Sequence, residues 1–119
     1  MRVVTEQEFA AKARHLFTSV KDFIRPRAVT GPGRSGAIAA VYASYMLKIP
    51  FLPYGVKCPL NLRPLLIIDT ARYSGATLRR AERRYATRNQ NDAVVAWVLD
   101  EPPVVKFWYQ EVVNGQKDR

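Results

Sequence analysis

The sequence predicts a single α/β domain, residues 1–119, built around a mostly parallel sheet with flanking helices. Two runs of consecutive apolar residues, 65–68 and 93–99, show no polar alternation. Such runs are typical of strands that are buried on both faces, as in a parallel sheet. Segments with helical periodicity alternate with them along the chain. A length of 119 residues allows one hydrophobic core and leaves no room for a second domain.

The first helix has a clear start signal. Thr5 and Glu8 form a capping box, in which Thr5 is the N-cap and Glu8 reaches back to the Thr5 backbone N–H. Apolar residues recur at helical spacing from Phe9 to Ile24, which predicts an amphipathic helix over residues 6–23. His15 lies within it and is interpreted as a surface or packing residue.

A short strand over residues 28–30 leads into a glycine-rich turn, residues 31–36, and then a helix over 37–48. The turn matches G-x-G-x-x-G, but the acid that a dinucleotide site needs at the end of the next strand is missing. A P-loop would need Lys and Ser or Thr after Gly36, where Ala37 and Ile38 stand instead. Taken alone, the turn fits an anion site or a tight structural turn with an exposed arginine equally well.

The next segment, residues 49–54, reads as a second strand, and its two prolines favour an edge position. A connector over residues 55–63 follows. It leads directly into the apolar run 65–68, which Asp69 ends.

Asp69 is therefore expected at the carboxyl edge of the sheet, where open α/β sheets bind ligands. A small, hydroxylated turn follows at residues 73–77, and a helix is predicted from Leu78 to about Ala86. Backbone N–H groups of such a turn and the positive end of the helix dipole face the same point, which suits a phosphate. Gly75 permits close approach, and a carboxylate upstream can accept hydrogen bonds from sugar hydroxyls. This combination indicates a ribose 5-phosphate site.

Residues 65–77 resemble the motif with which type I phosphoribosyltransferases bind 5-phosphoribosyl 1-pyrophosphate (PRPP). Asp69 stands at the first of the two acids, and Tyr73 to Thr77 stand at the 5-phosphate loop. Three positions depart from the motif: Thr70 replaces the second acid, Arg72 an aliphatic residue, and Tyr73 the first small residue of the loop. The resemblance covers residues 5–110 and implies a Rossmann-like fold with a reduced hood subdomain.

The resemblance implies a role for each matching segment. Asp69 would bind the ribose hydroxyls, and the turn 31–36 would hold pyrophosphate. The short connector 55–63 would stand where the family has a lid loop, and Lys57 would be a catalytic residue together with Asp69. An ordinary connector is the alternative for this segment. The edge of the sheet near residues 104–113 would complete the nucleobase pocket, although core packing is the alternative for at least one of its aromatics. The full sets are, for ribose 5-phosphate, Asp69, Thr70, Ala71, Arg72, Tyr73, Ser74, Gly75, Ala76 and Thr77; for pyrophosphate, Gly33, Arg34, Ser35 and Gly36; and for the base, Phe107, Trp108 and Tyr109.

The implied reaction transfers the ribose 5-phosphate of PRPP to a nucleobase, orotate-like or purine, with release of pyrophosphate. Magnesium would arrive with the substrate, so no dedicated protein metal site is expected. Relatives that act on 6-oxopurines resemble one another in having an aspartate at the position that Tyr73 occupies here. The tyrosine argues mildly against that subclass. Thr70 retains a hydrogen bond but not the charge of the second acid, which predicts weakened turnover.

Composition leaves a second function open. The formal net charge is +9, and Arg79, Arg80, Arg83 and Arg84 form a basic stripe on the helix after the central motif. The stripe is most simply a solvated helix face. The alternative is a catalytically weak or inactive PRPP-fold module that regulates or binds nucleic acid.

Cys58 is the only cysteine, and no apolar run approaches the roughly 20 residues of a membrane span. We therefore expect a cytoplasmic protein without membrane contact. The resemblance further implies a homodimer.

Overall fold

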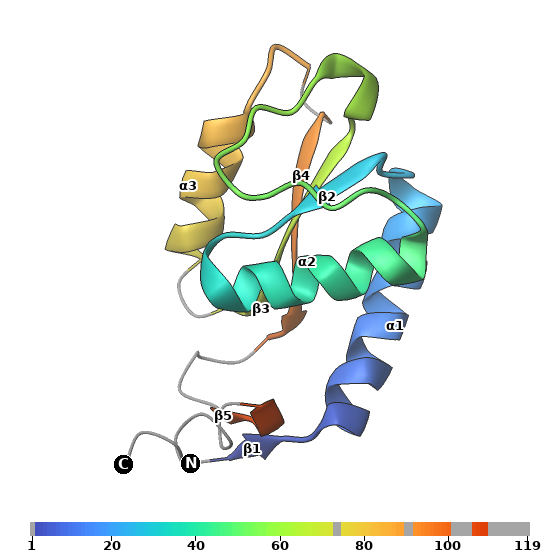
Figure 1. Ribbon diagram of the computed structural model, residues 1–119, viewed down its shortest axis with the longest axis vertical. Helices are drawn as coiled ribbons and strands as arrows, with labels where there is room; N and C mark the ends of the chain where they lie inside the picture. The colour runs from blue at the N-terminus through green and yellow to red at the C-terminus, as the bar shows by residue number, and fades with distance from the viewer. Residues whose placement is uncertain (1, 73–74, 90–91, 101–105, 110–119) are drawn as a thin grey trace.

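The computed structural model describes residues 2–72, 75–89, 92–100 and 106–109. Its centre is a three-stranded parallel sheet in the order β2-β3-β4 (Figure 1). The strands are β2 (Ala28–Thr30), β3 (Leu65–Ala71) and β4 (Ala93–Leu99). Leu65 pairs with both Ala28 and Ala93, so the three strands begin in line. The predicted parallel α/β fold is confirmed.

Helices cover both faces of this sheet. Helix α1 (Glu6–Phe23) and helix α2 (Gly33–Leu47) pack on one face, against Val29, Leu66 and Ile68. Helix α3 (Ala76–Tyr85) packs on the other, against Leu65 and Ile67. Alternate β3 side chains thus enter two separate core clusters, and this explains why residues 65–68 are all apolar.

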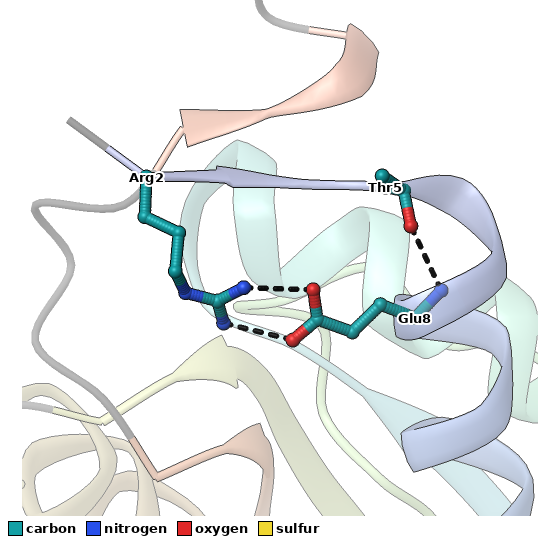
Figure 2. Close-up of polar contacts among 3 residues, drawn as sticks. All are labelled: Arg2, Thr5 and Glu8. Carbon is teal, nitrogen blue, oxygen red and sulfur yellow. Dashed lines mark hydrogen bonds and ion pairs between the residues drawn. The ribbon is translucent and has the colours of Figure 1, made fainter.

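Helix α1 has the predicted bounds, and Thr5 caps it. The Thr5 hydroxyl accepts a hydrogen bond from the Glu8 backbone N–H at 3.1 Å (Figure 2). The capping box is nevertheless incomplete, because the Glu8 carboxylate does not turn back to Thr5. It accepts two hydrogen bonds from the Arg2 guanidinium instead, at 2.7 and 2.8 Å, since a guanidinium fork matches a carboxylate better than one amide does.

The two ends of the described chain meet in a second, two-stranded sheet. Strand β1 (Val3–Val4) pairs in parallel with β5 (Lys106–Phe107). The strand expected within residues 104–113 is therefore short: Trp108 and Tyr109 take helical geometry directly after it. Residues 104, 105 and 110–113 lie outside the described residues.

The predicted strand over residues 49–54 is reduced to one bridge between Phe51 and Val29 at the free edge of β2. Pro50 and Pro53 lack the N–H that a longer ladder would need, which explains the reduction. The connector that follows contains one 3₁₀ turn, η1 (Leu60–Leu62). Among the described residues, no helix combines the length and apolar character needed to cross a membrane.

Candidate functional site

Two strand-to-helix turns open at one edge of the sheet. Strands β2 and β3 are parallel neighbours, and each is followed by a helix that starts at its carboxyl end. In Figure 1 the N-terminal ends of α2 and α3 both lie at the lower left of the three-stranded sheet, above β1 and β5. The positive ends of both helix dipoles therefore point toward the region beyond β2 and β3. This is the common edge that the sequence predicts for the two candidate anion turns.

The first turn is more helical than expected. Helix α2 begins at Gly33 rather than at residue 37, so Gly33, Arg34, Ser35 and Gly36 form its first helical turn instead of a loop. Pro32 is the N-cap, no side chain caps the helix, and no acidic residue stands in its first turn. Such an uncapped start presents backbone N–H groups to a ligand. The Arg34 side chain is exposed beside them, whereas Ser35 is half-buried.

The start of α2 lies against β3 because Gly31 and Gly36 lack side chains. A Cβ atom on Gly31 would lie 2.0 Å from the Gly36 carbonyl oxygen and 2.7 Å from that of Ile68. Gly33 has a positive φ of 67°, a conformation that glycine adopts without strain. The glycines of this turn therefore bring its backbone close to the central strand.

The second turn is shorter than predicted, because Ala76 and Thr77 already belong to the helix that follows β3. Helix α3 begins at Ala76, with Gly75 as its N-cap at a φ of 79°. No described side chain caps this helix, its first turn has no acid, and Thr77 is exposed there. Tyr73 and Ser74, both assigned to this turn from the sequence, lie outside the described residues.

Asp69 lies within β3, two residues before the strand ends, and is half-buried. Its Oδ1 atom accepts a hydrogen bond from the Thr70 backbone N–H at 2.7 Å. Burial raises the pKa of Asp69, while the contacts with the Thr70 backbone and side chain lower it. The Asp69 carboxylate is therefore only partly solvated, near the carboxyl end of β3. Hydrogen-bond donors of a ligand would stabilise its negative charge.

Two threonines at this edge are buried. Thr70 is only 3% exposed, so its hydroxyl serves Asp69 rather than the solvent side of the turn. Thr30, the last residue of β2, is fully buried, and its hydroxyl has no hydrogen-bond partner among the described residues. The sequence analysis missed Thr30, although its position at the end of a parallel strand was a usable signal.

Arg72 joins the ends of β3 and β4. Its guanidinium carbon lies 4.3 Å from the centroid of the Trp97 ring, and its Nη2 atom lies 3.4 Å from an Asp100 carboxylate oxygen. Its backbone N–H donates to the Leu99 carbonyl at 3.1 Å. Arg72 thus anchors the start of the second turn to β4, while Ala71 packs against the core. The sequence analysis missed this contribution of Trp97 and Asp100.

The three aromatics expected in a base pocket gather around Phe9. The Phe107 and Trp108 rings contact the Phe9 ring at centroid distances of 5.8 and 5.7 Å. An extended strand would turn Phe107 and Tyr109 to one face and Trp108 to the other. Tyr109 does stack on Phe107 at 5.6 Å, but the Trp108 ring also contacts Tyr109, at 5.0 Å. The helical geometry after β5 causes this difference. Phe107 is 3% exposed and therefore a core residue, whereas Trp108 and Tyr109 are half-buried.

Lys57 does not join this edge. It lines a hollow of about 890 Å³ between the connector 55–60, Arg63 and the C-terminal end of α3. Arg63 donates to the carbonyls of Tyr85 and Asp92, which places this hollow beside the start of β3 and β4. Asp69 follows Arg63 by six positions in the sequence, and extended chain of that length spans roughly 20 Å. The structure therefore separates Lys57 from the other predicted site residues.

No group of three or more His, Cys, Asp or Glu side chains within the described ranges could hold a metal ion. Asp69 lies on β3, the strand that leads into the second turn.

The fold is shared with solved phosphoribosyltransferase structures. The chain matches the Helicobacter pylori xanthine-guanine-hypoxanthine phosphoribosyltransferase with a TM-score of 0.72 and 14% identity, over 99% of this chain and 97% of that one. It matches a purine phosphoribosyltransferase from Pyrococcus horikoshii with a TM-score of 0.68 and 17% identity, over 88% and 84%. A hypothetical protein from Neisseria gonorrhoeae with bound ppGpp gives 0.60 and 14%, over 89% and 80%.

No protein-family model matches this chain, and no curated protein matches it. The likeness is therefore one of fold. This chain has the compact type I phosphoribosyltransferase fold that the motif at residues 65–77 predicts.

Proposed function

We propose that the protein is a phosphoribosyltransferase that transfers the ribose 5-phosphate of PRPP to a purine base and releases pyrophosphate. One observation carries the proposal: the N-termini of α2 and α3, whose first turns contain no acidic residue, open at one sheet edge, with Asp69 on the strand beside them. PRPP carries anionic groups at both ends of a sugar, and two positive helix ends flanking a carboxylate match that distribution of charge.

In this proposal each turn holds one end of the substrate. The start of α3, with Gly75, Ala76 and Thr77, binds the 5-phosphate together with Tyr73 and Ser74 of the motif. The start of α2 binds pyrophosphate through backbone N–H groups, and the exposed Arg34 adds a charged donor. Neither first turn contains an acid that would repel phosphate.

Asp69 is the proposed ribose ligand. Transfer passes through a state with positive charge on the ribose, and a nearby carboxylate stabilises that charge as it develops. Hydrogen bonds from the ribose hydroxyls replace the hydration that burial removes from Asp69. Thr70 helps to hold the carboxylate in place through its backbone N–H, rather than acting as a second acid.

Magnesium is proposed to enter with PRPP rather than to be held by a dedicated protein site. The chain's own contribution would be Asp69 together with the N–H groups of the α2 turn, which hold the oxygens around the ion. Such an ion would stabilise the negative charge that develops on the leaving pyrophosphate.

A purine is favoured over an orotate-like base because two proteins of the same fold, from Helicobacter pylori and Pyrococcus horikoshii, are purine phosphoribosyltransferases. Trp108 and Tyr109 are the predicted base-pocket residues that remain partly exposed, since Phe107 is buried in the core. The position of Lys57 gives it no part in this proposal.

A base screen tests the proposal. The protein is incubated with PRPP, Mg²⁺ and one of adenine, guanine, hypoxanthine, xanthine or orotate, and pyrophosphate release is measured. Release should require a purine, and Asp69→Asn should abolish it, whereas the exposed Asp22→Asn on α1 should not. If PRPP binds but no base gives pyrophosphate release, the protein is a binding module and the proposed enzymatic activity is wrong.

A homodimer in the cytoplasm is the proposed state of the protein. Val41 and Tyr45 on the outer side of α2 are 41% and 82% exposed, and an apolar helix face of this kind suits burial against a second copy. Sedimentation of the wild type and of Tyr45→Glu tests this, because the charged variant should be monomeric.

A second candidate function, binding to nucleic acid, rests on α3. Arg79, Arg80, Arg83 and Arg84 are all exposed on it, with Glu82 as the one acid of the helix. Like charges four residues apart destabilise a helix, and a polyanionic partner would neutralise this repulsion. If it binds nucleic acid, affinity should fall steeply with salt and drop with Arg80→Gln and Arg83→Gln. Replacing the exposed Lys12 and Arg14 of α1 is the matched control.

A further inference from the structure

A basic hollow lies at the end of the sheet where β3 and β4 begin, away from the candidate site. Its volume of about 890 Å³ is within the range of pockets that receive organic groups. Three of its lining side chains are cationic, those of Lys57, Arg63 and Arg84, and no acidic side chain is among the described residues that line it. The candidate site uses none of these cations.

The positive charge of the hollow is not neutralised within the described part of the chain. Arg63 and Arg84 donate hydrogen bonds to backbone carbonyls, which carry no net charge. Lys57 is exposed, and none of the three cations forms an ion pair with a described residue. An anionic partner would therefore meet these cations without displacing a carboxylate from them.

One wall of the hollow is the connector after Tyr54, which hydrogen bonds hold against α3. The Tyr85 hydroxyl accepts from the Gly55 N–H at 2.8 Å and donates to the Val56 carbonyl at 3.0 Å. Arg84 donates to the Gly55 carbonyl at 3.1 Å. In Figure 1 the connector, drawn in green, runs beside α3. The hollow is therefore pre-formed, which lowers the entropy cost of binding.

Aromatic and apolar groups stand beside the cations. The Tyr54 ring is 38% exposed, packs edge-on against Tyr85 at 5.8 Å and lies 5.7 Å from the guanidinium carbon of Arg84. Val56 and Leu60 of the connector are 47% and 79% exposed. A planar base can stack on an exposed aromatic ring or a guanidinium group while its phosphates pair with neighbouring cations.

The hollow is continuous with the basic stripe of α3, because Arg84 belongs to both. The stripe runs along a helix of 10 residues, which is about 15 Å long. Its cations thus follow a line instead of surrounding one point, and this suits a chain of phosphates better than a single phosphate group. A duplex keeps its bases stacked inside, so only a single strand can present a base to Tyr54.

We propose that the hollow, with Tyr54, Lys57 and Arg84, receives an unstacked base of a single-stranded nucleic acid whose backbone follows the basic stripe of α3. The inference rests on the proposed binding of nucleic acid by α3. It adds the form of the partner and the place where a base is held. It also gives Lys57, which lies far from Asp69, a role as a phosphate ligand.

The test measures binding of a labelled oligouridylate, alone and annealed to oligoadenylate, by fluorescence anisotropy at several salt concentrations. Tyr54→Leu removes the stacking ring, so it should raise the Kd for the single strand about tenfold and leave the Kd for the duplex unchanged. Lys57→Gln should reduce the slope of log K against log salt by about 0.7 for the single strand. Phe23→Leu and Lys12→Gln, which replace exposed residues of α1, are the matched controls and should change neither quantity.

The outcomes distinguish this inference from the function on which it rests. If the wild type binds neither RNA, binding of nucleic acid by α3 fails, and the role of the hollow fails with it. If Arg80→Gln and Arg83→Gln weaken binding but Tyr54→Leu and Lys57→Gln do not, the stripe binds nucleic acid and the hollow takes no part.

Two further results would overturn the role of the hollow. One is equal weakening of single-strand and duplex binding by Tyr54→Leu, because no unstacked base would then be involved. The other is binding of uridine monophosphate as tight as that of the oligomer, which would identify a site for a small phosphate compound. Melting curves show whether each variant is folded, and Lys57→Gln, which changes an exposed side chain, decides the matter if Tyr54→Leu is not.

Discussion

Gly31 and Gly36 pack backbone against backbone at the point where β2 leads into α2. A Cβ on Gly36 would lie 2.7 Å from the Gly31 carbonyl carbon, and a Cβ on Gly31 would lie 2.0 Å from the Gly36 carbonyl oxygen. Neither distance is compatible with a side chain, and the obstructing atoms are backbone. This contact fixes the start of α2 against β3 and so sets the position of the first anion turn relative to Asp69.

Gly31→Ala is therefore expected to displace the turn and to destabilise the protein by more than about 3 kcal/mol, as severe core clashes do. Gly33→Ala is the matched control, because nothing lies within 4 Å of its added Cβ. Its only penalty is the positive φ of 67°, which costs about 1–2 kcal/mol. Urea unfolding of both variants measures the difference, and equal losses would contradict the packing argument.

Asp69→Asn should separate stability from activity. Burial raises the pKa of Asp69, so the ionised form is less favourable in the folded than in the unfolded chain. That penalty is absent below the unfolded pKa and grows as the pH rises through the folded value. Asparagine does not ionise and can still accept from Thr70. The variant should therefore melt at a higher temperature than the wild type at pH 7, the gap should close near pH 3, and pyrophosphate release should be lost at every pH.

Two Tyr→Phe variants should change stability in opposite directions. The Tyr85 hydroxyl accepts from the Gly55 N–H at 2.8 Å and donates to the Val56 carbonyl at 3.0 Å, which ties the connector to α3. Tyr85→Phe removes both bonds and should cost about 1–2 kcal/mol. Tyr109→Phe removes a hydroxyl that has no partner and should leave the stability of the ligand-free protein unchanged or higher. Denaturant midpoints of the two variants check the contrast.

The N-terminal contacts predict a graded set of losses. Thr5→Ala removes the N-cap of α1 and should cost about 1 kcal/mol. Glu8→Gln weakens the exposed pair with Arg2 and should cost less than about 1 kcal/mol, with a smaller effect in 1 M salt.

The pH dependence of the Arg2–Glu8 pair has a definite sign. The hydrogen bond from Arg2 is the main reason that the pKa of Glu8 is lowered from its usual 4.5. The contribution of the pair is therefore present above pH 4.5 and disappears as the pH falls through the folded value. A wild-type advantage over Glu8→Gln that persisted at pH 2 would show that the ion pair is not its cause.

The sequence by itself determined the parallel α/β fold, because the signals involved are local. Apolar runs at residues 65–68 and 93–99 mark doubly buried strands, and the periodicity from Phe9 to Ile24 marks a helix whose bounds proved correct. The two strand-to-helix turns were also visible, since a glycine-containing turn between a strand and a helix is a feature of neighbouring residues. Helix starts were placed two to four residues late, because glycine at Gly33 reads as a turn residue even when it opens a helix.

Only the tertiary structure decided which distant groups meet. The pairing of β1 with β5 places Phe107 against Phe9 of α1, and the path of the connector carries Lys57 to the opposite end of the sheet. Arg72 reads as a substitution within a phosphate motif, yet its guanidinium lies over Trp97 on the neighbouring strand. These placements depend on strand order, register and long-range packing. The free energy of such contacts arises between segments far apart in the chain, so no local pattern records them.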